Sequence, residues 1–251
     1  MSNSIESPVP GPGGRLSVWR RAGRVFARPA MAFEGFESGS GVWFPLITTI
    51  LLEVGITAAT FERALLPDIF ARWDEMVASG RMEPAQVEQL RAGMTANLTM
   101  RFGTIGSSAL GVPLLTLLMA LLLWFVAGFL LGGRFGFSRA WAVAAWSWLV
   151  LWPGSILRGV LAWAGESFQS VHLGLGVLVP TPEEPSKLFR FLTVLLDALS
   201  PFSAWWLVVI VFGVAAVSGL SRRKVGLALT LTYLFLAACG AALAALLGPG
   251  A

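Results

Sequence analysis

Five long apolar runs constrain this chain more than any other feature of its sequence. A helix needs roughly 20 apolar residues to cross the hydrocarbon core of a bilayer. Five stretches reach that length, at about 43–66, 105–131, 139–164, 202–220 and 225–248. None of them alternates between apolar and polar residues as the strands of a membrane barrel do. The sequence therefore predicts an all-α fold, a polytopic membrane bundle of five transmembrane helices.

The composition agrees with a membrane protein. Hydrophobic residues make up 56% of the chain and charged residues only 13%, whereas about a quarter of the residues in a soluble domain are charged. The isoelectric point near 10.2 raises the question of nucleic acid. The cations, however, are spread over the loops between apolar runs and form no long basic face. We therefore expect the lipid bilayer, and no nucleic acid, as their partner.

The segments outside the five runs divide the rest of the chain. Residues 1–14 are rich in Pro, Gly and Ser and are predicted to be a disordered tail. Residues 15–37 are expected to be a cytoplasmic basic segment, and residues 38–251 the membrane domain. The polar stretch 67–104 has two helical patterns, with Gly80 as a stop and Pro84 as a start. It predicts a helical hairpin outside the membrane, between the first two spans.

The N-terminal basic segment has the pattern of a short amphipathic helix. Apolar residues recur at the spacing of one helical face, namely Val18, Trp19, Ala22, Val25 and Phe26. The other side carries most of four arginines, Arg20, Arg21, Arg24 and Arg28. A basic helix with aromatic residues on its apolar face is typical of a membrane interface. The pattern favours an interfacial helix over its alternative, a helix docked on the bundle.

A basic turn, SRRK at residues 221–224, separates the last two runs. Lys and Arg in short loops are retained on the cytoplasmic side of a membrane. An inside N-terminus places the cations of all the short loops in the cytoplasm and most acidic residues outside. We therefore predict a cytoplasmic N-terminus and an extracytoplasmic C-terminus. Seven cations are interpreted as topology anchors, with binding of anionic lipids as the alternative role: Arg20, Arg21, Arg24, Arg28, Arg222, Arg223 and Lys224.

Two ionisable residues are predicted to lie within the membrane. Glu53 falls near the middle of the first span, where a charge costs about 2.5–3.5 kcal/mol and needs a partner, water or a proton. Arg158 lies in the outer third of the third span, at a depth that differs from that of Glu53 by roughly 10 Å. A direct ion pair then needs a helix tilt or a kink. We favour a neutral Glu53 bonded to a neighbouring helix over an ion relay, and an Arg158 that snorkels outward.

Small residues and prolines are interpreted as packing features. Gly128 and Gly132 have the GxxxG spacing that lets helices approach closely, and Pro113 and Pro153 can kink spans two and three. His172 has no Cys or second His with which to form a metal site. No constellation of catalytic residues and no phosphate-binding loop is present in the sequence. We expect no enzyme activity, no cofactor and no bound metal.

Several segments, in their order, resemble the Yip (Ypt-interacting protein) family of five-span membrane proteins. "VFARPAMAF" followed by "WFPL" is similar to the start of that family's first span. "GGRFGFSRAWAVAAWSWLVLWPGSIL" resembles its second-to-third turn and third span, and "SPFSAWWLVVIVFGVAAVSGLSRRKVGLAL" its last two spans. "GRMEPAQVEQLRAGM" looks like the first extracytoplasmic loop of bacterial members.

The resemblance implies a cytoplasmic N-terminus and no enzyme activity. Eukaryotic relatives act in vesicle traffic and bind Rab-type GTPases and each other. The N-terminal tail here is short beside theirs, so GTPase binding is not expected to carry over.

The sequence thus predicts a multi-pass protein of a bacterial inner membrane. The bacterial origin rests on the excess of Arg over Lys among 18 basic residues and on abundant Ala, Leu and Gly. The expected function is a non-enzymatic organisation of the membrane or of partner proteins, with anionic lipids bound. A transporter, channel or lipid-flipping protein that uses Glu53 is the alternative. A homo-oligomer or a complex with other membrane proteins is left open.

Overall fold

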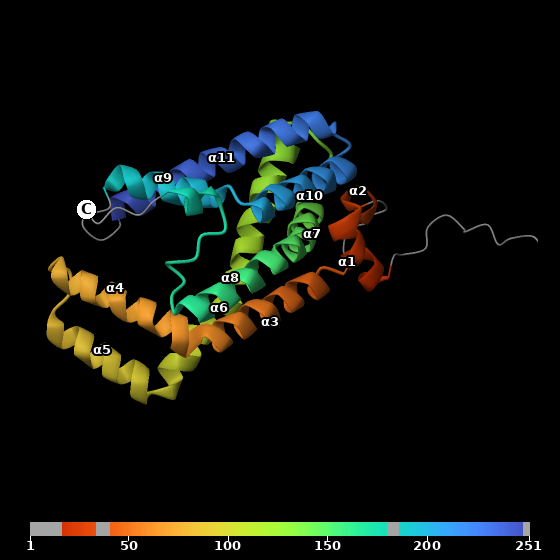
Figure 1. The fold of residues 1–251 in the computed structure, drawn as a ribbon. Helices are drawn as coiled ribbons and strands as arrows, with labels where there is room; N and C mark the ends of the chain where they lie inside the picture. Colours follow the sequence, from red (N-terminus) through yellow and green to blue (C-terminus); the bar gives the residue numbers. More distant parts are fainter. Residues whose placement is uncertain (1–16, 34–40, 180–185, 248–251) are drawn as a thin grey trace, which may run out of the picture.

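The computed structural model describes residues 17–33, 41–179 and 186–247, and every regular element in these ranges is helical. The expected disordered tail, residues 1–14, lies outside them. Five helical rods are long and apolar enough to cross a membrane (Figure 1): Trp43–Ala78, Leu98–Leu130, Phe137–Gly165, Pro201–Ser218 and Arg222–Leu246. The all-α class and the five apolar spans are therefore confirmed.

The first rod is longer than the span expected from the sequence. It consists of α3 (Trp43–Thr60), a π-helical segment η1 (Phe61–Leu65) and α4 (Leu66–Ala78), with no break between them. A turn at Gly80, whose φ is +69°, reverses the chain into α5 (Pro84–Ala96). The expected hairpin between the first two spans is thus present as α4 and α5, and its first arm directly continues the first span.

The second rod begins where the hairpin ends. The side chain of Asn97 accepts a hydrogen bond from the backbone N–H of Thr99 (2.9 Å) and caps α6 (Leu98–Leu123). Pro113 lies inside α6. A second π-helical segment, η2 (Trp124–Leu130), continues the rod. Gly132 follows with a φ of +67°, a left-handed conformation that ends the helix at little cost for glycine.

The first part of the third rod, α7 (Phe137–Ser147), forms the centre of the bundle. The rod continues with a 3₁₀ turn η3 (Trp148–Leu151) and α8 (Trp152–Gly165). Pro153 lies in the first turn of α8, directly after the 3₁₀ turn, where its missing N–H removes no helical hydrogen bond. Residues on nearly all sides of α7 are buried, from Ala140 to Ser147 with the exception of Trp141. A helix buried all round is expected at the centre of a bundle.

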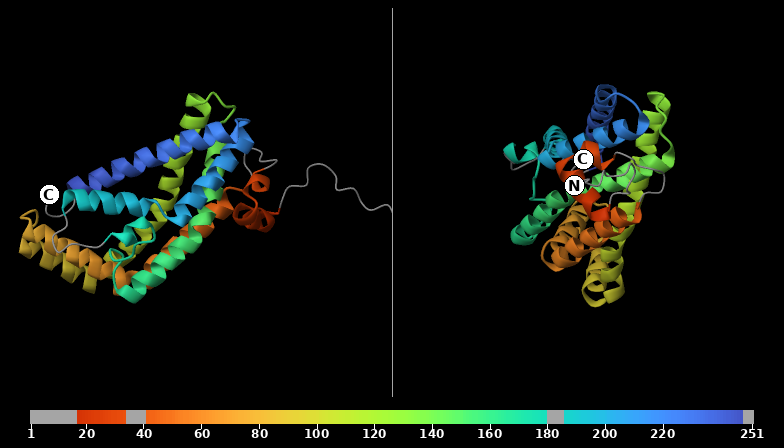
Figure 2. Two further views of the ribbon diagram at one scale, coloured as in Figure 1. Left: turned by 45° about the horizontal axis from the view of Figure 1, so that its top comes forward. Right: turned by 90° about the vertical axis from the view of Figure 1, so that its right-hand side faces the viewer.

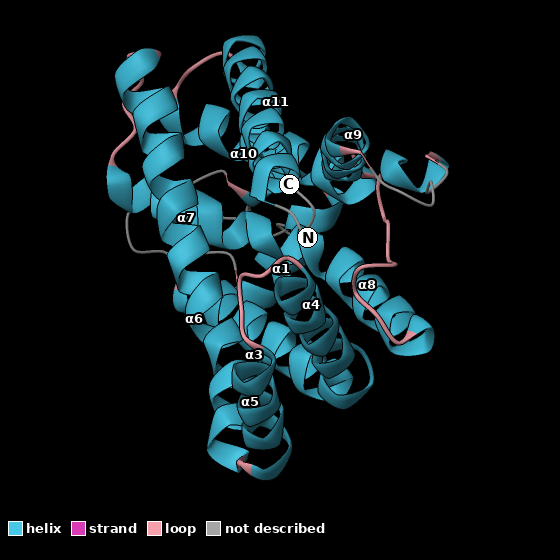
Figure 3. Cartoon of the chain, turned by 90° about the vertical axis from the view of Figure 1, so that its left-hand side faces the viewer, coloured by secondary structure: helices cyan, strands magenta, loops and turns pink. Residues whose placement is uncertain are grey.

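The remaining helices pack on this centre or on one another (Figures 1 and 2). α10 (Pro201–Ser218) packs on α7, and α11 (Arg222–Leu247) packs on both α10 and α9 (Lys187–Ala198). The short N-terminal helices α1 (Val18–Ala27) and α2 (Pro29–Ala32) lie at the end of the bundle opposite the α4/α5 hairpin. Figure 3 views the molecule from the hairpin end, with α5, α4 and α9 towards the reader.

Glycines mark the closest approaches between helices. A Cβ atom on Gly213 of α10 would lie 2.9 Å from Val143 of α7 and 3.1 Å from Phe33. A Cβ on Gly159 of α8 would lie 2.7 Å from Ile56 of α3. The GxxxG pair has different surroundings. A Cβ on Gly128 would meet the backbone oxygen of Phe135 at 3.0 Å, and one on Gly132 would meet nothing within 4 Å.

We predict that Gly213→Val destabilises the bundle. The added side chain would collide with Val143 and Phe33, which are fully buried and cannot move aside. Overpacking of this kind costs about 1–3 kcal/mol. The matched control is Gly240→Val in α11, where a Cβ meets nothing within 4 Å. Thermal unfolding in detergent should give a lower Tm for the Gly213 variant alone, and equal Tm values would contradict this packing.

Candidate functional site

The helix α1 is docked on the bundle by a face that includes an arginine. Arg21 and Val25 are buried, and Val18 and Ala22 pack against the core. Trp19 is 76% exposed and Phe26 is also exposed. The docked face is therefore rotated relative to the apolar face expected from the sequence, which had grouped Trp19 and Phe26 with Val18, Ala22 and Val25. The two aromatic side chains are left available to lipid.

Arg21 differs from the other three arginines of α1. Only 7% of its surface is exposed, and its guanidinium lies 5.5 Å from the centre of the Trp146 ring in α7. Burial lowers the pKa of Arg21 from its usual value because a charged group is disfavoured away from water. Arg21 thus contributes to docking, whereas Arg20 and Arg28 are exposed and Arg24 is half-buried.

Two further basic segments lie at the same end of the bundle as α1. The turn that contains Gly133 adjoins the α10–α11 turn, since a Cβ on Gly133 would lie 2.8 Å from Leu220. We call α1 and these two turns the basic end. Its exposed or half-buried cations number eight, and they are Arg20, Arg24, Arg28, Arg134, Arg139, Arg222, Arg223 and Lys224.

The eight cations just named make no ion pair within the described part of the chain. All four ion pairs that the structure shows there lie on other helices: Arg63–Glu166, Arg91–Asp74, Arg101–Glu62 and His172–Asp197. The described residues of α1, α2 and the two turns contain no Asp or Glu. Glu6, Glu34 and Glu37 lie outside the described residues. The basic end therefore combines a high density of positive charge with exposed aromatic side chains.

Exposed aromatic residues surround these cations. Trp43, at the start of α3, is 73% exposed, and Trp19 packs edge-on against Phe44 with ring centres 5.1 Å apart. Trp side chains are enriched where a membrane protein meets the lipid headgroups. Cations next to such aromatics are suited to binding lipid phosphates while the rings enter the upper acyl region.

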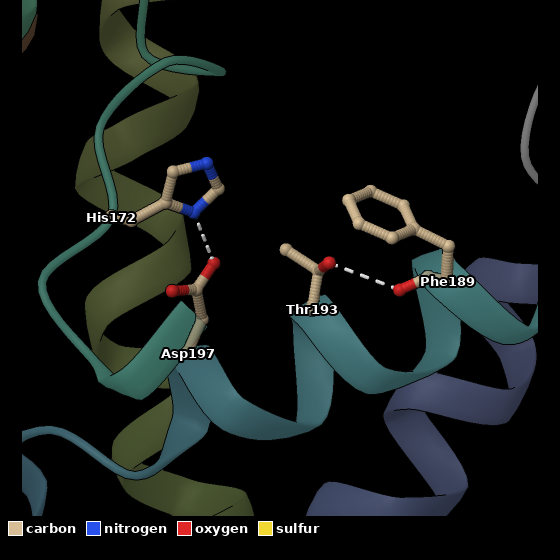
Figure 4. A network of polar contacts seen from close by, with 4 residues as sticks. All are labelled: His172, Phe189, Thr193 and Asp197. Atoms are coloured by element: carbon tan, nitrogen blue, oxygen red, sulfur yellow. Dashed lines mark hydrogen bonds and ion pairs between the residues drawn. The ribbon is translucent and has the colours of Figure 1, made fainter. Parts of the chain in front are cut away.

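The hairpin end has paired charges instead. Asp68 of α4 accepts hydrogen bonds from the Ser167 hydroxyl (2.6 Å) and the Phe168 backbone N–H (2.7 Å), which fixes the loop after α8. His172 in this loop contacts Asp197 of α9 at 2.6 Å, and Thr193 on the same helix bonds to the Phe189 carbonyl (Figure 4). Within the described ranges no three His, Cys, Asp or Glu residues are grouped so as to hold a metal.

The structure places Glu53 and Arg158 closer in depth than the sequence suggested. α3 and α8 lie side by side, and the Trp152 indole donates to the Thr49 hydroxyl (3.0 Å) while Gly159 adjoins Ile56. This register separates Glu53 from Arg158 by about two residues, or roughly 3 Å along the axis, instead of 10 Å. The difference in depth estimated from the sequence was too large because, along the bundle axis, α7 begins well before the start of α3.

The two groups nevertheless do not pair. Arg158 is exposed, and its guanidinium lies 5.7 Å from the centre of the Phe168 ring in the loop after α8. Glu53 is half-buried and has no hydrogen bond or ion pair to any residue that the structure describes. The side-chain hydrogen bond between α3 and α8 is made by Thr49, which lies one helical turn before Glu53.

A second polar site lies at the hairpin end, and sequence reasoning did not find it. A cavity of about 300 Å³ opens between η1, α6 and α8, and its lining includes Phe61, Glu62, Arg63, Arg101 and Trp163. The sequence signal for it was the pair Glu62 and Arg63 near the end of the first apolar run. Neither residue alone predicts a site, because Arg101 and Trp163 become their neighbours only in the folded chain.

This fold, with a basic end and five apolar rods, defines the class as a polytopic α-helical membrane protein. Within that class, the family model of the Yip1 domain matches residues 23–245. The chain therefore belongs to the Yip1 domain family, one that is associated with membrane traffic and is not known for enzymes. Comparison with curated proteins and with solved structures gave no match.

We predict that both basic turns face the side on which the N-terminus lies, the cytoplasm, and that the hairpin faces the other side. Reporter fusions can test this. Alkaline phosphatase, which is active only outside the cytoplasm, should be active when fused after residue 247 and inactive when inserted at residue 221. Green fluorescent protein should give the reverse pattern. Phosphatase activity at residue 221 would contradict the orientation.

Proposed function

We propose that this protein is a non-enzymatic organiser of a bacterial inner membrane, and that its basic end gathers anionic lipids. The observation that carries the proposal is the set of eight exposed or half-buried cations without described ion pairs beside Trp19 and Trp43. Membership of the Yip1 domain family, with its association with membrane traffic, supports a role in membrane organisation.

The docking of α1 strengthens this argument. A free amphipathic tail loses conformational entropy when it binds a membrane, whereas a docked helix has already lost it. Val25 is fully buried and Arg21 is held over Trp146, so the positions of Arg20, Arg24 and Arg28 are fixed relative to the bundle. Each cation near an anionic surface contributes about 1 kcal/mol. A fixed array of cations can therefore collect several anionic headgroups around one protein.

We predict that replacing three of these cations weakens binding of anionic lipids. In the triple variant that carries Arg20→Gln, Arg24→Gln and Arg28→Gln, the affinity for phosphatidylglycerol should fall at least about tenfold at low salt. The measurement is lipid retention by the purified full chain in native mass spectrometry, with phosphatidylcholine as the neutral reference.

A matched control carries the same change of charge at the hairpin end. Arg72, Arg81 and Lys187 are exposed, and their replacement by Gln also removes three positive charges. This control should retain phosphatidylglycerol as the unmodified protein does. Equal losses in the two triple variants would mean that net charge alone sets binding, and the proposed role of α1 would be wrong.

The transport alternative predicts that the protein carries a flux that requires Glu53, whereas the organiser proposal predicts no flux. The structure gives no observation in favour of transport, since Glu53 has no described partner on another helix. We expect proteoliposomes to show no lipid or ion flux above empty liposomes, and Glu53→Gln to leave that result unchanged. Flux that disappears in Glu53→Gln would overturn the organiser proposal in favour of a transporter.

A further inference from the structure

The cavity at the hairpin end lies at the level of lipid headgroups. α3 has 18 residues and is therefore about 27 Å long, close to the thickness of a hydrocarbon core of about 30 Å. Since Trp43 at its start is exposed at one interface, η1 at its far end reaches the other. Trp163, a lining residue of the cavity, is also exposed, as interfacial tryptophans are.

The π-helical segment brings opposite charges to the cavity from adjacent positions. Its wider turn directs Phe61 and Ala64 into the bundle and leaves Glu62 and Arg63 exposed. Glu62 pairs with Arg101 of α6, and Arg63 pairs with Glu166 at the end of α8 (3.3 Å). π-helical segments occur frequently at functional sites. Here the segment connects the two walls of the cavity.

The arginines lie against aromatic rings, and the glutamates are the more exposed partners in both ion pairs. Arg63 lies 4.2 Å from the Trp163 ring centre, and Arg101 lies 5.4 Å from that of Phe61. The side chain of Arg101 is 26% exposed, whereas that of Glu62 is 74% exposed. The carboxylates of Glu62 and Glu166 can therefore swing towards water and accept another cation at little cost, because exposed ion pairs contribute at most about 1 kcal/mol.

We propose that this cavity binds the zwitterionic headgroup of an aminophospholipid, the phosphoethanolamine group. Its phosphate lies between Arg63 and Arg101, and its ammonium group donates to Glu62 and Glu166. The two arginines and two glutamates balance both charges of this headgroup. The acyl chains pass over the apolar lip of the cavity, which is formed by Ala58, Ala59 and Ile105.

The alternatives fit the same site less well. An anionic headgroup such as phosphatidylglycerol leaves both glutamates beside a phosphate without a cation to pair. The quaternary ammonium of choline has no N–H to donate to a carboxylate, and it is best held over open aromatic faces. Phe61 is buried, and the Arg63 guanidinium already occupies one face of the Trp163 ring, so the site has no cage of open aromatic faces. The site is separate from the basic end and does not depend on the proposed function.

The test is lipid retention by the full chain in native mass spectrometry. Phosphatidylethanolamine, phosphatidylcholine and phosphatidylglycerol with identical acyl chains are compared in the Arg20→Gln, Arg24→Gln, Arg28→Gln background, which lowers binding at the basic end. We expect phosphatidylethanolamine to be retained about tenfold better than phosphatidylcholine, since hydrogen bonds to charged groups are the stronger ones. Arg101→Gln should lower retention of phosphatidylethanolamine, because it removes one of the two groups assigned to the phosphate.

The control is Arg91→Gln. Arg91 has surroundings like those of Arg101, an acidic partner (Asp74, 2.6 Å) and a phenylalanine ring (5.1 Å), but it lies in the hairpin away from the cavity. This variant should retain phosphatidylethanolamine as its background does. Unchanged retention in Arg101→Gln, or an equal loss in Arg91→Gln, would overturn the proposal.

A second variant gives an independent result. Glu62→Gln keeps both arginines and removes one of the negative charges that attract the ammonium group, so the preference should shift from phosphatidylethanolamine towards phosphatidylglycerol. An unchanged order of lipids would contradict the assignment of the ammonium group. Soluble phosphoethanolamine at equimolar concentration should not displace the lipid. Full displacement would show that the ligand is a soluble headgroup and not a lipid.

Discussion

The close packing of small residues around α7 is the interaction on which the rest of the structure depends. Lipid tails are as apolar as leucine, so helices in a bilayer associate through van der Waals contact and not through the hydrophobic effect. α7 carries four alanines between positions 140 and 145, and Gly213 of α10, which has no side chain, lies directly against Val143. Bulkier residues at these positions would separate α10 from α7 and expose Phe33, which packs at the same contact.

The position of α7 along the bundle axis determines where the N-terminal helices can dock. Phe44, near the start of α3, stacks on Trp146 with ring centres 6.0 Å apart, so most of α7 lies beyond the start of α3. α1 docks on α7 and on the η3 turn that follows it, with Arg21 over Trp146, and α2 packs on α10. Without this docking, the N-terminal arginines would belong to a tail whose distance from the membrane varied. The docking turns them into a surface with fixed spacing.

Local signals explain which parts of the fold could be predicted. The five spans follow from the length of the apolar runs, and the hairpin turn follows from Gly80 and Pro84, which act on their own backbone. The direction in which α1 is docked could not be predicted, since it depends on Trp146, far along the chain. The depth of Arg158 relative to Glu53 depends on how α7 overhangs α3. No sequence pattern marks the two π-helical segments, in which each turn holds more residues than an α-helical turn. The cavity beside η1 and the surroundings of Gly128 could therefore not be predicted from the sequence.

The two ends of the bundle place different physical demands on lipids. At the basic end the eight exposed or half-buried cations have no acidic partner among the residues that the structure describes, so their attraction for anionic headgroups is long-ranged and weakens as salt shortens the screening length. At the hairpin end Arg63 and Arg101 are already paired and lie against aromatic rings, so little net charge extends from the cavity. Selection there depends on short hydrogen bonds whose geometry a headgroup must match. Salt should therefore suppress binding at the first end and leave selectivity at the second, which separates the two surfaces within one protein.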